Sequence, residues 1–98
     1  MDLRFVFTAE LFEWDATEAT WVFVQLPIED ADEIREDVPN RRGFGSVRVA
    51  VQVGETRWKT SIFPDSKSGS FVLPVKKDVR NSEGLDVGYS AEFDIEIL

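Results

Sequence analysis

The stretches FVQLP at residues 23–27 and FVLP at residues 71–74 decide the fold prediction, because each joins an apolar strand to a helical segment. Proline has no amide hydrogen for a strand ladder, and its fixed φ suits the first turn of a helix. Each Leu-Pro pair therefore marks where a strand ends and a helix begins. The helical segments, residues 28–38 and 75–82, carry apolar side chains at helical spacing. The chain thus contains two strand, Leu-Pro, helix units.

Alternation of apolar and polar residues predicts strands around these units, at residues 3–12, 20–26, 46–53, 56–63, 70–73 and 90–98. The inward positions are expected to include Leu3, Phe5, Phe7, Ala9, Leu11, Val47, Val49, Val51, Val53, Ala91, Phe93, Ile95 and Ile97. Residues 15–19 are predicted to be a polar hairpin connection, and Gly54 with Glu55 a turn. Gly84 suits the position just after a helix.

The order of these segments predicts a mainly β fold: one β-barrel domain, residues 1–98, with two short helices. A single strand–strand–helix unit would expose both a sheet edge and an apolar face, and interlocking two such units removes both problems. We therefore expect a double-split barrel with pseudo-two-fold symmetry, built from two ββα-type units and capped by its two helices. A length of 98 residues fits one domain.

Composition removes several function classes. The chain has no cysteine and no histidine, so it offers no thiolate metal site, no disulfide and no imidazole base. We expect no metal, no cofactor and no enzymatic activity. The formal net charge of -8 disfavours nucleic acid as a partner. No apolar run approaches the roughly 20 residues of a membrane span, and the first residues show no signal-peptide pattern, so a cytoplasmic location is expected.

Residues 21–27, 47–53, 60–64 and 69–80 together resemble a bacterial and archaeal family known as domain of unknown function nineteen-oh-five. The resemblance covers nearly the whole chain, and its most specific part is Leu-Pro-Val-Lys-Lys at residues 73–77. It implies a small double-split β-barrel, similar to the AbrB and MazE class of transition-state regulators and antitoxins. The family has no assigned catalytic residues, so none is carried over. Many relatives have Gly-Asp where this chain has Gly88-Tyr89.

Two basic clusters are candidate binding residues. Arg41 and Arg42 beside Phe44 and its flanking glycines form a loop that could hold a phosphate or carboxylate, or simply turn tightly. Lys76, Lys77 and Arg80 form a basic patch if the second helix is present; its alternative is a solvated helix face. The clusters form one site only if they meet at one end of the barrel.

Aromatic residues exceed the need of a one-sided core. Trp14, Trp21 and Trp58, with Phe12, Phe44 and Phe63, could line a ligand groove or a partner interface, or fill a small barrel. Trp58 and Phe44 are the aromatic residues we select as candidate binding residues.

Acidic residues are interpreted as solvated. Glu92, Asp94 and Glu96 form a row on one strand face, and the first helix is rich in Asp and Glu, but no calcium-loop pattern is present.

The leading hypothesis is a non-catalytic module that engages a protein partner or a small acidic ligand. The first alternative, by fold analogy, is a DNA-binding regulator or antitoxin-like protein. The second is an enzyme that uses carboxylates, which predicts two acids converging in a pocket with raised pKa values. The oligomeric state is left open, because an incompletely closed barrel could pair its free edge with another chain.

Overall fold

A computed structural model describes residues 3–16, 19–38 and 45–98. These residues form seven strands and two helices, which confirms the mainly β prediction. The strands are β1 (Arg4–Glu10), β2 (Phe12–Ala16), β3 (Ala19–Gln25), β4 (Val47–Val53), β5 (Thr56–Asp65), β6 (Ser70–Pro74) and β7 (Ser90–Ile97); the helices are α1 (Ile28–Asp37) and α2 (Lys77–Glu83).

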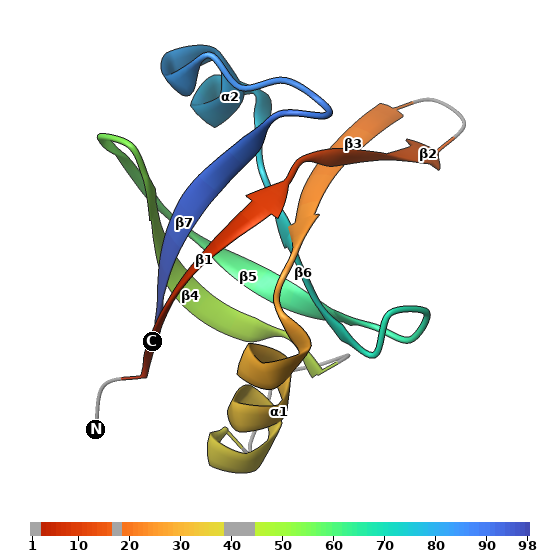
Figure 1. Ribbon diagram of the computed structural model, residues 1–98, viewed down its shortest axis with the longest axis vertical. Coiled ribbons are helices and arrows are strands. Elements are labelled where there is room, and N and C mark those ends of the chain that lie inside the picture. Colours follow the sequence, from red (N-terminus) through yellow and green to blue (C-terminus); the bar gives the residue numbers. More distant parts are fainter. Residues whose placement is uncertain (1–2, 17–18, 39–44) are drawn as a thin grey trace.

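The described strands pair antiparallel in one curled sheet, ordered β1-β7-β4-β5-β6-β3-β2 (Figure 1). Two long stretches of chain turn from one half of this sheet into the other. The first is β1 and β2 joined at the buried Leu11, because β1 pairs with β7 and β2 pairs with β3. The second is β5, whose residues 56–62 pair with β4 and residues 63–65 with β6. We call β1-β7-β4-β5 sheet A and β5-β6-β3-β2 sheet B.

The strand order confirms the predicted pseudo-two-fold symmetry and extends the repeated unit by one strand. β1 with β2 corresponds to β5, β3 to β6, α1 to α2, and β4 to β7. Under this correspondence the strand order of sheet A is the same from either end, and so is that of sheet B. The unit is therefore ββαβ, where the sequence predicted ββα. Its last strand crosses over: β7 pairs with β1 of the first unit and also with β4. Each unit completes a sheet of the other, which is the interlocking expected from the repeat.

The core lies between the two sheets. Val47, Val49, Val51 and Val53 are all buried, as the alternation predicted. On β1 and β7 the corresponding inward positions pack into the same cluster, with Phe7 and Phe93 stacked at a centroid distance of 6.0 Å. Burying this one apolar face of each strand drives the sheet to curl, because a flat sheet would leave that face in water.

The two helices lie at opposite ends of the molecule (Figure 1). α1 buries Ala31 and Ile34 and packs near β6. Arg35 fastens it there: its Nη2 donates to the carbonyl of Gly69 at 2.7 Å, and its guanidinium lies 5.7 Å from the Phe71 ring centroid. At the other end, Gly84 closes α2 in a left-handed conformation, with φ of 64°, as predicted.

Two sequence predictions were wrong in detail. Residues 15–19 were predicted as a connection, but β2 runs to Ala16 and β3 begins at Ala19, so the paired part of the hairpin is longer than predicted. The second helix was predicted from residue 75, but it begins at Lys77. The reason is that the Val75 amide donates to the Val22 carbonyl at 2.9 Å, which prolongs strand pairing beyond Pro74 and leaves Lys76 extended.

Candidate functional site

The outer side of the β2–β3 hairpin carries the rings of Phe12, Trp14, Trp21 and Phe23, which we call the aromatic face. Phe12 lies opposite Phe23, and Trp14 lies opposite Trp21. Residues directly opposite on neighbouring strands share one face of a sheet. The intervening Val22 points the other way, into the core cluster. The aromatic face is therefore on the side of sheet B that is turned away from the core.

Phe23 is the centre of the aromatic face. Its ring centroid lies 4.7 Å from that of Trp14 and 6.2 Å from that of Phe12, and it stacks on Trp21 at 6.4 Å. These contacts leave Phe23 only 7% exposed. The two tryptophans that cover it remain open to solvent, with Trp14 43% and Trp21 55% exposed. The face is thus a preformed cluster whose outermost rings have no protein contact over about half their surface.

The apolar surface continues across sheet B beyond the hairpin. Pro74 lies opposite Phe23, and Val72 lies opposite both Gln25 and Phe63, so these side chains share the outer face. Val72 is almost fully buried by its neighbours, whereas Phe63 is 41% exposed. An apolar band therefore crosses sheet B from β2 to β5.

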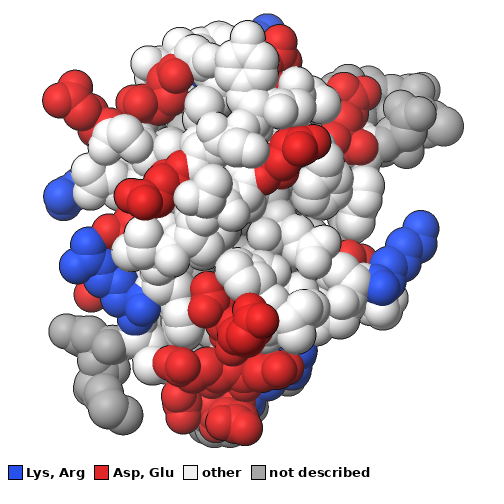
Figure 2. Space-filling view, in the orientation of Figure 1, with Lys and Arg blue, Asp and Glu red and all other residues white. Residues whose placement is uncertain are grey.

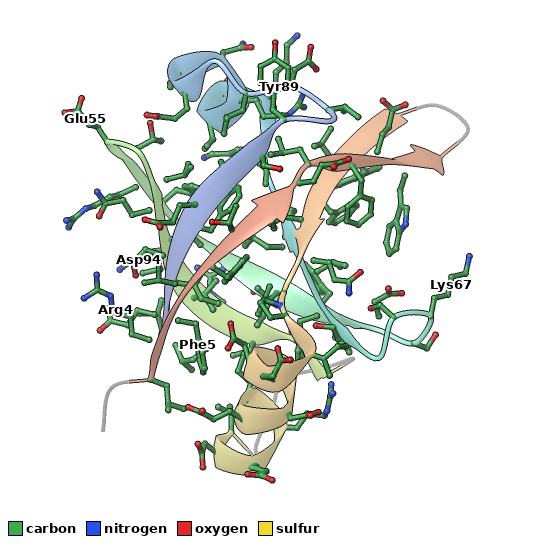
Figure 3. All side chains as sticks on the ribbon, viewed as in Figure 1. Arg4, Phe5, Glu55, Lys67, Tyr89 and Asp94 are labelled. Atoms are coloured by element: carbon green, nitrogen blue, oxygen red, sulfur yellow. The ribbon has the colours of Figure 1, made fainter. Side chains whose placement is uncertain are left out.

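The outer side of sheet A is charged. Two cross-strand rows, read from β1 through β7 and β4 to β5, make up its surface: Arg4, Glu96, Ala50 and Lys59 in one, and Val6, Asp94, Gln52 and Arg57 in the other. We call the polar members of these rows the charged face. Figure 3 shows Arg4 and Asp94 together on the outer side of β1 and β7, with Phe5 on the inner side.

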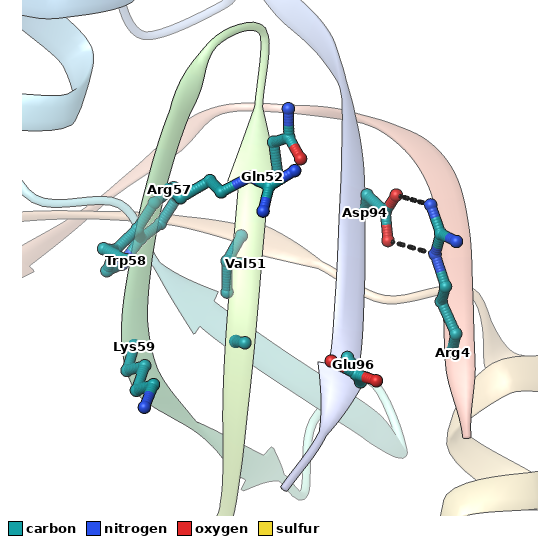
Figure 4. A pocket seen from close by; sticks show the side chains of 9 residues that line it. Arg4, Val51, Gln52, Arg57, Trp58, Lys59, Asp94 and Glu96 are labelled. Atoms are coloured by element: carbon teal, nitrogen blue, oxygen red, sulfur yellow. Dashed lines mark hydrogen bonds and ion pairs between the residues drawn. The ribbon is translucent and has the colours of Figure 1, made fainter. Parts of the chain in front are cut away.

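A groove of about 420 Å³ lies on the charged face (Figure 4). Its floor includes Ala50, whose small side chain separates Glu96 on β7 from Lys59 on β5. Because those two residues are two strands apart, their Cα atoms are roughly 10 Å from each other. Among the described residues, neither Arg57 nor Lys59 lies within ion-pair distance of an acid. The groove therefore presents cations on one wall and carboxylates on the other.

The carboxylate of Asp94 is already engaged. The Nε of Arg4 donates to its Oδ1 at 2.8 Å, and the Arg4 Nη2 donates to its Oδ2. This hydrogen bonding lowers the pKa of Asp94 below its ordinary value, with partial burial opposing it and the charges of Arg4 and Arg57 adding to it. The same pairing raises the pKa of Arg4. The pair is fixed as ions, so the ligand-accessible charges of the groove are those of Arg57, Lys59 and Glu96.

The predicted site residues are distributed over the molecule. Arg41, Arg42 and Phe44 lie outside the described residues. Trp58 is half-buried against the core from β5 and also lines the groove.

The second basic cluster lies at the start of α2. Lys76 and Lys77 are exposed there. Arg80 differs from them, because its Nε donates to the carbonyl of Val75 at 3.1 Å and so supports the end of β6.

Sequence reasoning missed Gln52, Arg57 and Lys59 as groove residues. Their only signal was that polar side chains stand at most outward positions of the strands that became β4 and β5. Within residues 3–16, 19–38 and 45–98, no group of three or more Asp or Glu side chains is arranged to hold a metal ion. In the same part of the chain, no helix has the length and apolar character needed to cross a bilayer.

Comparison with known families gives one result that covers most of the chain. Residues 7–95 match the family described as Domain of unknown function (DUF1905). A search of curated proteins found no match. Because the family match spans nearly all of the sequence, the chain belongs to this family, and the resemblance seen in its motifs is confirmed.

Proposed function

We propose that this protein is a non-catalytic interaction module that docks a protein partner on its aromatic face. The observation that carries the proposal is the exposure of Trp14 and Trp21 on one side of an edge hairpin. Exposure of large aromatic rings to water is unfavourable, and a contiguous exposed apolar patch marks an interaction site. Tryptophan is also enriched among the residues that contribute most to binding energy at protein interfaces. The ring contacts around Phe23 hold the cluster in place before any partner arrives.

Position-specific photo-crosslinking in living cells tests this proposal. Trp21→p-benzoylphenylalanine places the reactive group on the aromatic face, and Lys59→p-benzoylphenylalanine places it on the charged face as the matched control. The expected result is one or a few discrete adducts from position 21 and a weak, diffuse background from position 59. Absence of discrete adducts at position 21, or equal adducts at both positions, would contradict the proposal.

A small acidic ligand in the groove is the second candidate function. The observation that favours it is the unpaired state of Arg57 and Lys59 beside Ala50. Ala50→Leu fills the groove without removing a charge. If the groove binds small carboxylates, citrate should raise the melting temperature of the wild-type protein and not that of Ala50→Leu. An equal shift in both proteins would remove this candidate.

Two further alternatives from the sequence receive less support. The carboxylate-enzyme hypothesis needs convergent acids with raised pKa values, but the pKa of Asp94 in the groove is lowered. Burial, together with Glu29 and Glu33, raises the pKa of Asp30, which lies on the surface of α1 away from the groove residues. The DNA-binding hypothesis needs a basic face, and Arg57 and Lys59 share theirs with Asp94 and Glu96.

A further inference from the structure

The net charge of the protein is concentrated in one stretch of sequence. Residues 5–34 contain eight Asp or Glu and no Lys or Arg, whereas the rest of the chain holds eleven of each sign. That stretch comprises most of β1, the whole β2–β3 hairpin and the first part of α1. Figure 2 shows acidic side chains gathered over α1, with Lys and Arg near the margins of the same view. The aromatic face therefore lies on a stretch of chain that carries acids and no cations, with Glu13 exposed on β2 itself.

β2 is an end strand of the sheet. It pairs with β3 on one side, and no described strand pairs with its other side. An end strand exposes a row of backbone donors and acceptors, and proteins usually protect it with charged side chains, proline, a bulge or a very short strand. In the sequence of β2, FEWDA, the charged residues Glu13 and Asp15 are both acidic, and the strand contains neither lysine nor proline. Its charges therefore repel an acidic strand but not a basic one. The free edge of β2 lies beside the exposed ring of Trp14, so one added basic strand would meet both backbone groups and an aromatic surface.

We propose, building on the docking function above, that β2 accepts an extended basic peptide segment of its partner as an additional antiparallel strand. Strand addition supplies backbone hydrogen bonds, and alternate side chains of the added strand supply specificity. On an added strand, a residue opposite Glu13 lies on the inner side and a residue opposite Trp14 lies on the aromatic face. The matching segment therefore has Lys or Arg opposite Glu13 and an apolar or Arg side chain opposite Trp14, where Arg stacks on the ring.

Charge favours a basic peptide segment over a second copy of the chain as the strand that pairs with β2. Two copies joined through β2 would bring together two chains of net charge -8. Pairing two FEWDA strands also adds acids to acids along the joined edge, and like charges on paired strands destabilise a sheet. A basic segment meets the same edge with complementary charge, which speeds encounter and selects among partners.

The test uses the full chain and a labelled seven-residue peptide that alternates valine and lysine, with binding followed by fluorescence anisotropy. The matched peptide has glutamate in place of lysine. A third peptide keeps the lysines but carries N-methyl groups on alternate amides, which removes its strand-forming donors on one edge. We expect the basic peptide to bind at least about tenfold more tightly than either of the others, because charge and backbone pairing both contribute.

Two charge reversals locate the binding edge. Glu13→Lys acts on β2, and Glu92→Lys makes the same change in net charge at an exposed position on β7. Glu13→Lys is expected to weaken binding about tenfold and Glu92→Lys about twofold, because a distant surface charge is screened by salt. Glu13→Gln, with circular dichroism of all three variants, shows whether folding is retained and supplies an intermediate loss of affinity.

Several outcomes would overturn the inference: equal binding of the acidic and basic peptides, equal binding of the N-methylated peptide, or equal losses from Glu13→Lys and Glu92→Lys. These outcomes are separate from failure of the docking function. A discrete adduct at position 21 with a neutral or acidic segment would keep the docking function and remove the basic partner. Peptide binding without any adduct at position 21 in cells would instead contradict the docking function.

Discussion

The outer faces of sheets A and B present different side chains to solvent. Both are turned away from the core and both belong to antiparallel strands, for which a polar outer face is the ordinary pattern. Sheet A follows that pattern, with Arg4 and Asp94 paired as ions and Gln52, Arg57, Lys59 and Glu96 on the same face. Sheet B places aromatic rings at the equivalent positions and leaves Trp14 and Trp21 half exposed. The outer face of sheet A is polar and carries its own ion pair, whereas the exposed rings of sheet B form the surface on which we propose that a partner docks.

The largest effect is expected from a core residue that lies between the two sheets. Leu11 is fully buried at the corner between β1 and β2. Leu11→Ala should lower the free energy of unfolding by about 2–5 kcal/mol, since it leaves a cavity in the shared core. Urea denaturation followed by circular dichroism measures the loss.

Val6→Ala is the matched control for Leu11→Ala, because Val6 is 54% exposed on β1. Its cost should stay below about 0.5 kcal/mol. Similar losses for the two variants would show that the corner does not belong to the common core.

A smaller change should disturb sheet A alone. Gly54 turns β4 into β5 with φ of 57°, and a Cβ there would lie 1.9 Å from Oε1 of Glu83. Glu83 accepts a hydrogen bond from the hydroxyl of Thr56 at 2.5 Å, so its displacement loosens the contact between this turn and α2. Gly54→Ala should cost about 1–3 kcal/mol through left-handed strain and this displacement.

Gly88→Ala separates the two causes, because Gly88 also has positive φ but its Cβ would meet open space. Thermal melts of both variants should show the larger loss for Gly54→Ala. An equal loss would mean that backbone strain alone accounts for the effect and that Glu83 adapts freely.

The comparison is sharpened by removing aromatic surface from sheet B. Trp21→Ala should cost about 0.5–1.5 kcal/mol, the range for an aromatic pair, because Trp21 stacks on Phe23 but is largely exposed. The same variant should abolish photo-adducts formed from a neighbouring position. A double-mutant cycle of Trp21→Ala with Phe23→Leu measures the coupling free energy between the two rings in the unfolding equilibrium. Zero coupling would show that the rings do not act as one cluster.

The smallest effect is expected from sheet A. Because the folded-state pKa of Asp94 is lowered, its pair with Arg4 stabilises the protein above the ordinary aspartate pKa of about 3.9 and loses that effect as pH falls through the lowered value. Asp94→Asn should therefore reduce stability slightly at pH 7 and have less effect at pH 3. A loss that grows at pH 3 would contradict this direction of the pKa change.

Much of the fold was predictable because buried strands and proline stops act locally. The four alternating valines of β4 and the two Leu-Pro pairs needed no knowledge of neighbouring strands. β2 was missed because its aromatic residues point outward. The available signal was a change of phase: Phe5, Phe7 and Leu11 are inward at odd positions, whereas the next rings, Phe12 and Trp14, stand at even positions.

The groove could not be predicted from the sequence for a different reason. Arg4 and Asp94 are ninety positions apart, and they meet only because β7 pairs with β1. Lys59 faces Glu96 across Ala50, and Arg57 faces Asp94 across Gln52, only because β4 separates β5 from β7. Alternation predicts which side chains point outward, but the order of strands decides which of them share a surface.

The position of β7 between β1 and β4 also sets the order in which the protein can be assembled during synthesis. A ribosome releases β1 and β4 long before β7, so sheet A has a gap in its middle until this strand emerges. The strands of sheet B, including the hairpin with its tryptophans, are all released before β7. Before β7 is made, a nascent chain can therefore expose the aromatic hairpin together with the unpaired edges of β1 and β4. Strand pairs between segments so distant in sequence also form slowly. We expect newly made chains to need protection from aggregation until β7 inserts.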